Sequence, residues 1–265
     1  MSRYLNPKTY FNWFYKRFFL SFLYDSARVN AEEDNKLSAL GGDRATALNK
    51  LNVFFKAGNG REFDYQNDSI HSLLFAIISL HHPISRILEI GTFSGESTRL
   101  LAQLFPDAEI ITVDLPEDDL LLRAYYKRGS DKEYQAYLEK QEKNLASPNI
   151  RLIKINSFFL NSKVSGMFNL IWIDGGHLYP EVAWDICNAW NLCAPRGIIL
   201  CDDVLPYKKL HKSPYHSSES FEVLQYVANR SSASPTLFLK RRNSNLYPFL
   251  LKRKYVACLQ KPALP

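Results

Sequence analysis

The sequence predicts an α/β fold in which a seven-stranded, mostly parallel sheet carries helices on both faces. From residue 69 onward, apolar segments at helical spacing alternate with short runs rich in β-branched residues. This alternation is typical of a parallel sheet with crossover helices. The first helix and strand, expected at 70–80 and 86–90, are followed by a tight glycine turn. We therefore expect one α/β domain over 67–265, preceded by an aromatic-rich helical extension and linker over 1–66.

Short apolar runs bounded by polar or turn residues mark the strands of this sheet. We expect strands at 86–90, 109–113, 150–155, 169–173, 197–201, 236–239 and 254–260. The segment 116–148, between the second and third strands, is charged and helix-like. It is longer than a simple crossover needs, so it is expected to form either part of a cap over the site or a plain surface helix.

The N-terminal extension begins with a segment, 1–28, that is rich in aromatic and basic side chains. Its aromatic residues at helical spacing are Phe11, Phe14, Tyr15, Phe18 and Phe22. Such a helix is expected to pack against the domain or a partner subunit of a homo-oligomer, or to lie peripherally on a membrane. Lys16 and Arg17 interrupt its apolar run, so a membrane span is not expected. The mixed-charge segment 30–60 contains several glycines and is expected to be a linker or loosely packed connection.

The net charge and the cysteine content restrict the class of protein but do not identify its binding partner. The 33 Lys and Arg residues exceed the 27 Asp and Glu residues and give a net charge of +6, which suits nucleic acid, anionic lipid or an anionic substrate equally. The basic residues are dispersed and no base-reading motif is seen, so nucleic acid is not favoured. The 4 cysteines have no metal-ligand or disulfide spacing. We expect reduced, buried thiols in a cytoplasmic protein, with peripheral membrane contact through 1–28 as an alternative.

A strand, a glycine turn and a helix start follow one another over 87–98, with the sequence ILEIGTFSGEST. Glycine lets the backbone approach a ligand closely. The segment resembles the first motif of class I S-adenosylmethionine (SAM) dependent methyltransferases, which have a Rossmann-like fold. The resemblance implies that Glu89, Gly91 and Gly95 hold the methionine part of the cofactor. Ser97, at the start of the expected helix, is also expected to bind the cofactor. Phe93 stands where many members have a third glycine.

Residues at the ends of the second and third expected strands suit the ribose and the adenine of the same cofactor. Asp114 ends the second strand 25 residues after Glu89, where a carboxylate can accept hydrogen bonds from both ribose hydroxyls. A solvated loop aspartate is the alternative. Asn156 and Ser157 follow the third strand, where the resemblance implies an acidic residue and a serine. The Asn156 amide oxygen can still accept a hydrogen bond from the adenine amino group.

Three carboxylates are expected to converge where the fourth and fifth strands end. Asp174 begins the sequence DGGH, which ends at His177, and Asp202 and Asp203 follow 28 and 29 residues later. The carboxyl ends of neighbouring parallel strands face one ligand crevice, and unpaired like charges there are costly. We therefore expect Asp174, Asp202 and Asp203 to hold a divalent cation, with Mg²⁺ as the first choice. The alternative is that Asp202 or Asp203 caps the following loop.

The order and spacing of these aspartates are similar to those of metal-dependent O-methyltransferases of the catechol type and of the macrolide and aminocoumarin sugar type. The resemblance covers about the last 200 residues. The stretch 168–204, with DGGHLYPEV, Asp185 and CDDV, looks especially like a bacterial small-molecule and sugar methyltransferase branch that includes cephalosporin hydroxylase-like proteins. Catechol-type enzymes have a lysine where this chain has His177, and sugar-type enzymes have an aspartate at Gly176.

The resemblance implies O-methylation of a hydroxyl on a small molecule or sugar, with Asp174 and His177 as the catalytic residues. His177 is the nearest candidate base, because an imidazole has an ordinary pKa near 6.5. A structural role for His177 is the alternative. Two rival functions stay open: a SAM-dependent enzyme that acts on another acceptor atom, and a non-catalytic SAM-binding interaction protein. The loop 205–218 is expected either to contact the acceptor or to be a flexible solvated loop.

Overall fold

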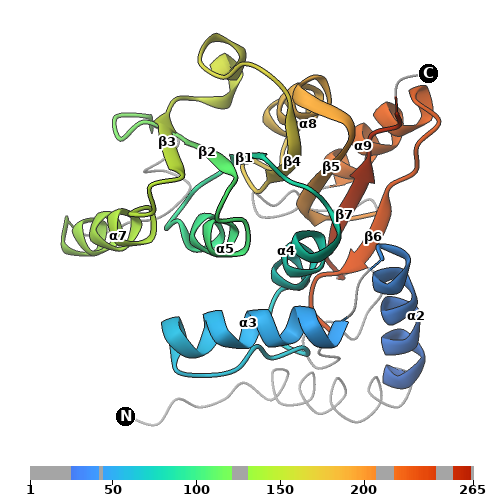
Figure 1. The fold of residues 1–265 in the computed structure, drawn as a ribbon. Helices are drawn as coiled ribbons and strands as arrows, with labels where there is room; N and C mark the ends of the chain where they lie inside the picture. The colour runs from blue at the N-terminus through green and yellow to red at the C-terminus, as the bar shows by residue number, and fades with distance from the viewer. Residues whose placement is uncertain (1–24, 42–43, 121–130, 207–217, 243–252, 264–265) are drawn as a thin grey trace, which may run out of the picture.

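The computed structural model describes residues 25–41, 44–120, 131–206, 218–242 and 253–263. Within them the chain forms a seven-stranded sheet in the order β3-β2-β1-β4-β5-β7-β6 (Figure 1). The strands are β1 (Arg86–Ile90), β2 (Glu109–Asp114), β3 (Ile150–Lys154), β4 (Phe168–Ile173), β5 (Cys193–Val204), β6 (Thr236–Leu239) and β7 (Tyr255–Gln260). β7 pairs antiparallel with both β5 and β6, and β1 to β5 pair in parallel. The expected mostly parallel sheet is thus confirmed.

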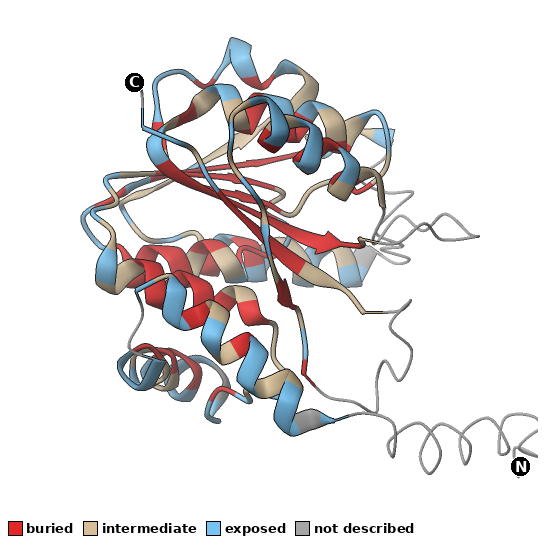
Figure 2. Cartoon of the chain, turned by 90° about the vertical axis from the view of Figure 1, so that its right-hand side faces the viewer, coloured by how far each residue is buried: buried red, intermediate tan, exposed pale blue. Residues whose placement is uncertain are grey.

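Helices cover both faces of the sheet and leave the strands buried between them (Figure 2). They are α2 (Ser26–Ala39), α3 (Arg44–Asn59), α4 (Ile70–His81), α5 (Glu96–Leu104), α7 (Asp131–Asn144), the 3-10 helix η1 (Ser157–Ser162), α8 (Glu181–Leu192) and α9 (Ser218–Arg230). One apolar core joins α2 to α5 with one face of the sheet, and the other joins η1, α8 and α9 with the opposite face. The alternation of side chains along each strand supplies both cores.

The order of the strands fixes where a ligand can bind. β1 pairs with β2 on one side and with β4 on the other, so the chain reverses its direction of progress across the sheet at β1. In an open α/β sheet, the crevice outside the carboxyl ends of the strands at such a reversal is the usual ligand site. The loops after β1 and β4 meet at this point, where the Asp174 N–H donates to the Ile90 carbonyl at 2.8 Å.

The segment expected to be a linker forms two helices instead. α2 and α3 occupy most of 30–60, and their apolar residues Leu37, Leu51, Phe54 and Phe55 are buried in the core beside α4. The expectation of a loose connection is wrong there, because Leu51, Phe54 and Phe55 stand at helical spacing on one face of α3 that packs inward. The boundary at 66 and 67 stays a prediction.

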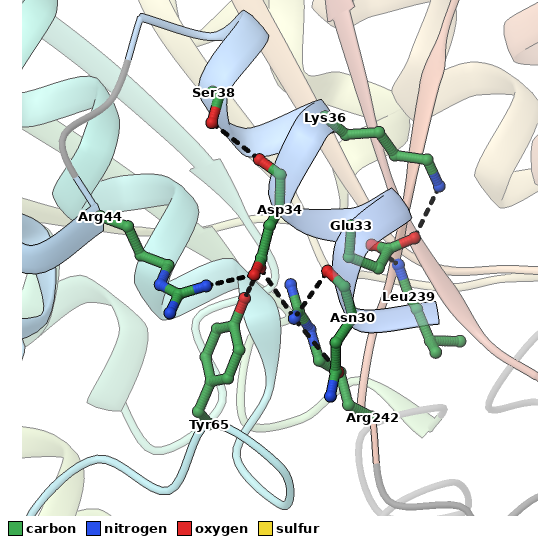
Figure 3. Close-up of polar contacts among 9 residues, drawn as sticks. All are labelled: Asn30, Glu33, Asp34, Lys36, Ser38, Arg44, Tyr65, Leu239 and Arg242. Atoms are coloured by element: carbon green, nitrogen blue, oxygen red, sulfur yellow. Dashed lines mark hydrogen bonds and ion pairs between the residues drawn. The ribbon is translucent and has the colours of Figure 1, made fainter. Parts of the chain in front are cut away.

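Polar contacts attach α2 to the edge of the sheet (Figure 3). The Leu239 N–H of β6 donates to Glu33 at 2.8 Å, and Lys36 donates to the Leu237 carbonyl at 2.8 Å. Asp34 accepts hydrogen bonds from Tyr65, at 2.5 Å, and from Arg242, at 2.9 Å. Because Glu33 is buried and pairs with the edge strand, α2 both covers that edge and fixes the chain that follows β6.

Several expectations fall on parts of the chain that are described only in part. The described portion of 116–148 includes α7, which packs against α5, while residues 121–130, and with them part of the proposed cap, lie outside the described residues. The aromatic segment over 1–24 also lies outside them. Among the described residues, no helix has the length and apolar character to cross a membrane. The cysteines are free thiols, but Cys187 is exposed, unlike the other three, which corrects the expectation of buried thiols.

Candidate active site

A cavity of about 360 Å³ opens at the carboxyl ends of the parallel strands. Its size falls in the ordinary range for small-molecule sites. The predicted site residues that line it are Gly91, Asp114, Asn156, Ser157, Asp174, His177 and Asp203. The cavity lining does not include Glu89, Gly95, Ser97 or Asp202. Some of the residues expected for the cofactor and some of those expected for the chemistry therefore share one space.

The glycine turn after β1 is built around Gly91, whose φ is +99°. A Cβ at this position would lie 2.4 Å from the Asp174 carbonyl oxygen. Any side chain here would thus displace the loop after β4. Phe93 also has a positive φ, of 47°, although it is not glycine. Non-glycine residues in this region carry backbone strain and mark functional turns.

Glu89 lies beneath the turn rather than in the cavity. Its side chain is fully buried and accepts hydrogen bonds from the hydroxyls of Thr98 and Thr112, the latter at 2.6 Å. Thr92 in turn contacts Thr112 at 2.6 Å. Burial raises the pKa of Glu89 to about 7, although the two hydroxyls act in the opposite direction. Glu89 is therefore placed to hold the turn and the start of α5 together.

Gly95 and Ser97 also lie behind the turn. Gly95 is the N-cap of α5 with a φ of 74°, and a Cβ there would lie 2.9 Å from Leu145. Ser97 lies in the first turn of α5 and is half-buried. Side chains of α7 support the same backbone: Tyr137 donates to the Phe93 carbonyl at 2.9 Å, and Asn144 donates to the Ser94 carbonyl at 2.7 Å. The described part of the expected cap thus stabilises the turn through hydrogen bonds from α7.

Asp114 ends β2 at the cavity wall and is already held in place by backbone groups. Its two carboxylate oxygens accept the Phe93 N–H at 3.0 Å and the Leu115 N–H at 2.9 Å. The carboxylate therefore ties the end of β2 to the glycine turn. A carboxylate oxygen can accept more than one hydrogen bond, so Asp114 suits a ligand hydroxyl in the cavity that it lines.

The loop after β3 contributes Asn156 and Ser157. Asn156 caps η1, because its side-chain oxygen accepts the Phe158 N–H at 3.0 Å. Asp185 of α8 also lines the cavity, although the sequence pattern had not marked it as a site residue. Burial raises the pKa of Asp185 to about 7. Its presence in the stretch DGGHLYPEVAWD was visible, but only the packing of α8 against η1 brings it to the cavity.

Asp174 and His177 lie together in the loop after β4. The imidazole Nε2 is 3.8 Å from Asp174 Oδ1 and 4.0 Å from Asp203 Oδ2. Burial lowers the pKa of His177, although the neighbouring aspartates favour its charged form. Burial and the nearby Asp202 raise the pKa of Asp174 well above its usual range. His177 is therefore neutral at neutral pH and adjoins two carboxyl groups.

Asp202 and Asp203 lie where the pairing of β5 with β7 becomes irregular. The register shifts between Cys201 and Val204, and Asp203 has a φ of 53°. Successive side chains of a regular strand point to opposite faces. Here both carboxylates reach the same ammonium group: Lys240 Nζ lies 2.5 Å from Asp202 Oδ2 and 2.6 Å from Asp203 Oδ1. Lys254 Nζ lies 2.9 Å from Asp203 Oδ2.

The donor set does not fit the expected divalent cation. The three aspartates do come together, as the sequence predicts, but Lys240 and Lys254 already contact Asp202 and Asp203. A hard cation needs several carboxylate or carbonyl oxygens directed at one point. No group of three or more His, Cys, Asp or Glu side chains in the described ranges is arranged to hold a metal. Sequence reasoning missed both lysines because they follow β6 and precede β7, far from the aspartates in the chain.

The chain resembles known methyltransferases over the part that builds this site. Residues 88–204 match a family described as a methyltransferase domain. That range runs from β1 to the end of β5 and includes every residue that lines the cavity, whereas Lys240 and Lys254 lie outside it. No curated protein matches the chain significantly.

Solved structures resemble the fold over about three quarters of this chain. A putative caffeoyl-CoA O-methyltransferase from Staphylococcus aureus has a TM-score of 0.52 at 14% identity, over 79% of this chain and 90% of its own. A putative rRNA methylase from Clostridium thermocellum has a TM-score of 0.50 at 14% identity, over 75% and 98% of the two chains. TomG, an O-methyltransferase from Streptomyces achromogenes solved with SAM, has a TM-score of 0.49 at 15% identity, over 91% and 100%. At such identities the likeness concerns the fold.

Proposed function

We propose that this chain, whose residues 88–204 match a methyltransferase-domain family, is a class I SAM-dependent methyltransferase that transfers the methyl group to a hydroxyl of a small molecule or sugar. The observation that carries the proposal is the shared cavity. It joins Gly91 and Asp114, which suit the cofactor, to His177, which suits proton removal from an acceptor.

The cofactor half of the cavity is assigned to Gly91, Asp114, Asn156 and Ser157. SAM supplies an electrophilic methyl group when it is bound. Gly91 lines the cavity with backbone that carries no side chain, and Asp114 offers two fixed acceptor oxygens for a ribose diol. Glu89, Gly95 and Ser97 act behind the turn, where they hold its shape.

The chemical half is assigned to His177 and Asp174. A neutral imidazole can take the proton of an acceptor hydroxyl as the oxygen attacks the methyl group. Asp174 and Asp203, within 4.0 Å of Nε2, stabilise the imidazolium that forms. The proton thus stays inside a cluster that is already rich in carboxyl oxygen atoms.

The expected divalent cation is left out of this reaction. Its predicted ligands Asp202 and Asp203 are engaged by lysines, so the proposal routes no step through a metal. We also propose an acceptor other than nucleic acid, a homo-oligomer, and peripheral membrane contact through 1–28.

The proposal is tested by incubating the protein with SAM and panels of hydroxylated metabolites and sugars, and measuring S-adenosylhomocysteine. Turnover with a hydroxyl acceptor that His177→Gln slows supports it. Turnover only with amine or carbon acceptors supports the first rival. Tight SAM binding without turnover on any panel supports a non-catalytic SAM-binding protein.

A further inference from the structure

We propose that the Lys240 ammonium group takes the place among Asp174, Asp202 and Asp203 that the sequence pattern reserves for a divalent cation. The inference deepens the proposed function, since it concerns the same site. Its test measures cation binding and needs no turnover. Lys240 is then a positioning residue that holds the carboxylates beside His177.

The contacts of Lys240 are those of a bridging cation. Its Nζ lies 2.5 Å from Asp202 Oδ2 and 2.6 Å from Asp203 Oδ1, and only 14% of its side chain is exposed. The two carboxylates are themselves 3% and 10% exposed. Charge-assisted hydrogen bonds in such surroundings are the strong ones, since little water competes for either partner.

Backbone hydrogen bonds on two sides hold Lys240 in place, so the fold itself positions the ammonium group beside the aspartates. The Lys240 N–H donates to the Lys254 carbonyl at 2.9 Å, and the Lys240 carbonyl accepts the Ile70 N–H of α4 at 2.9 Å. The antiparallel strand β7 lies between β5 and β6 and carries Lys254 to the same cluster (Figure 1). A hydrated cation would have to displace a buried side chain that is anchored at its base.

The charges of Asp202 and Asp203 also balance without a metal. Their two carboxylates contact the two ammonium groups of Lys240 and Lys254, while the His177 imidazole lies 3.8 Å from Asp174 and 4.0 Å from Asp203. The repulsion that predicted a cation is therefore already relieved. A divalent ion would add two positive charges beside ammonium groups that cannot easily leave.

Removing the Lys240 charge should open the cation site that the sequence describes. Lys240→Met is compared with the parent chain and with Lys261→Met, a matched lysine that donates to the Trp190 and Cys193 carbonyls away from the aspartates. Thermal unfolding of each full-length protein is followed in chelator and in rising Mn²⁺. Lys240→Met should unfold roughly 6 to 20 °C lower in chelator, because buried carboxylates lose their partner.

The expected result is that Mn²⁺ raises the melting temperature of Lys240→Met, by about 5 to 10 °C at 100-fold its dissociation constant, and leaves the parent and Lys261→Met unchanged. Stoichiometric Mn²⁺ binding by the parent that Asp203→Asn abolishes would overturn the inference. If Lys240→Met does not fold, the test is calorimetric titration of the parent and of Asp203→Asn with Mn²⁺. Absence of Mn²⁺ binding by the parent then supports the inference that the Lys240 ammonium group occupies the cation position. None of these outcomes depends on methyl transfer.

Discussion

Gly91 lies directly against the backbone of Asp174, so closely that a Cβ on Gly91 would sit 2.4 Å from the Asp174 carbonyl oxygen. The contact joins the turn proposed to face the cofactor to the loop that carries His177. The Asp174 N–H donates to the neighbouring Ile90 carbonyl at 2.8 Å and holds the two loops in register. A change at this contact should therefore disturb both the proposed cofactor site and the position of His177.

Gly91→Ala should destabilise the fold by about 3 kcal/mol or more, because it adds both a clash and left-handed backbone strain. Gly60→Ala is the matched control: Gly60 also has a positive φ, of 66°, but a Cβ there meets nothing within 4 Å. It should lose only about 1 to 2 kcal/mol. Urea unfolding of the two variants separates the cost of backbone strain, which both share, from the cost of the clash with Asp174. Equal losses of unfolding free energy would show that the close approach to Asp174 does not contribute.

Glu89 should make stability depend on pH, since burial raises its pKa to about 7. Below pH 4.5 the carboxyl is protonated in both the folded and unfolded states. As pH rises to 7, the unfolded chain ionises first, so folding loses up to about 3 kcal/mol, and the loss is constant above that pH. Glu89→Gln should therefore lose about 2 kcal/mol less than the parent between pH 5 and pH 8 in urea unfolding. The exposed Glu117→Gln should follow the parent, and identical pH profiles for Glu89→Gln and the parent would contradict the prediction.

His177 should set the acid side of the activity profile. Because burial lowers its pKa, kcat/KM should stay level through neutral pH and fall only below pH 6.5, the ordinary histidine value. His177→Gln should slow transfer about 10²- to 10⁴-fold and remove that fall. The exposed His81→Gln serves as the control. A parent profile whose acid limb persists in His177→Gln would assign the base to another group.

Methyl transfer should survive removal of divalent ions, because Lys240 already contacts Asp202 and Asp203. Initial rates of the parent are compared in excess chelator and in added Mg²⁺, with a known metal-dependent methyltransferase beside it to show that chelation is complete. Equal rates are expected for the parent. Loss of activity in chelator with recovery in Mg²⁺ would restore the cation that the sequence predicts.

Local sequence signals were enough for much of the sheet. β1 and β6 have the bounds expected from their apolar runs, because both are short and end at glycine or basic residues. β5 extends well beyond the expected 197–201, to Cys193–Val204. Its ends contain Pro195 and the irregular pair Asp202 and Asp203, which no strand pattern predicts. The linker expected over 30–60 was wrong because tertiary burial of Leu51 and Phe54, rather than local propensity, stabilises α3.

The sequence predicts those candidate site residues that lie at the carboxyl ends of parallel strands. Asp114, Asp174 and Asp203 reach the cavity because parallel strands bring their carboxyl ends together. Lys240 was not predictable in this way: it is 38 residues from Asp202 and arrives through the antiparallel pairing of β7. Glu89 faces Thr98 and Thr112 instead of the cavity, a distinction that depends on the register of β1 and β2 and the start of α5.

The most direct test of the proposed cofactor site is calorimetric titration of the parent, Asp114→Ala and Asp118→Ala with SAM. Asp114 lines the cavity, whereas Asp118 is an exposed aspartate a few residues further along the chain. The parent and Asp118→Ala should bind SAM equally, and Asp114→Ala should bind roughly 10- to 150-fold more weakly, because it loses hydrogen bonds to a charged acceptor. Circular dichroism confirms that each variant is folded. Equal affinity in Asp114→Ala, or no SAM binding by the parent, would contradict the assignment of this cavity to the cofactor.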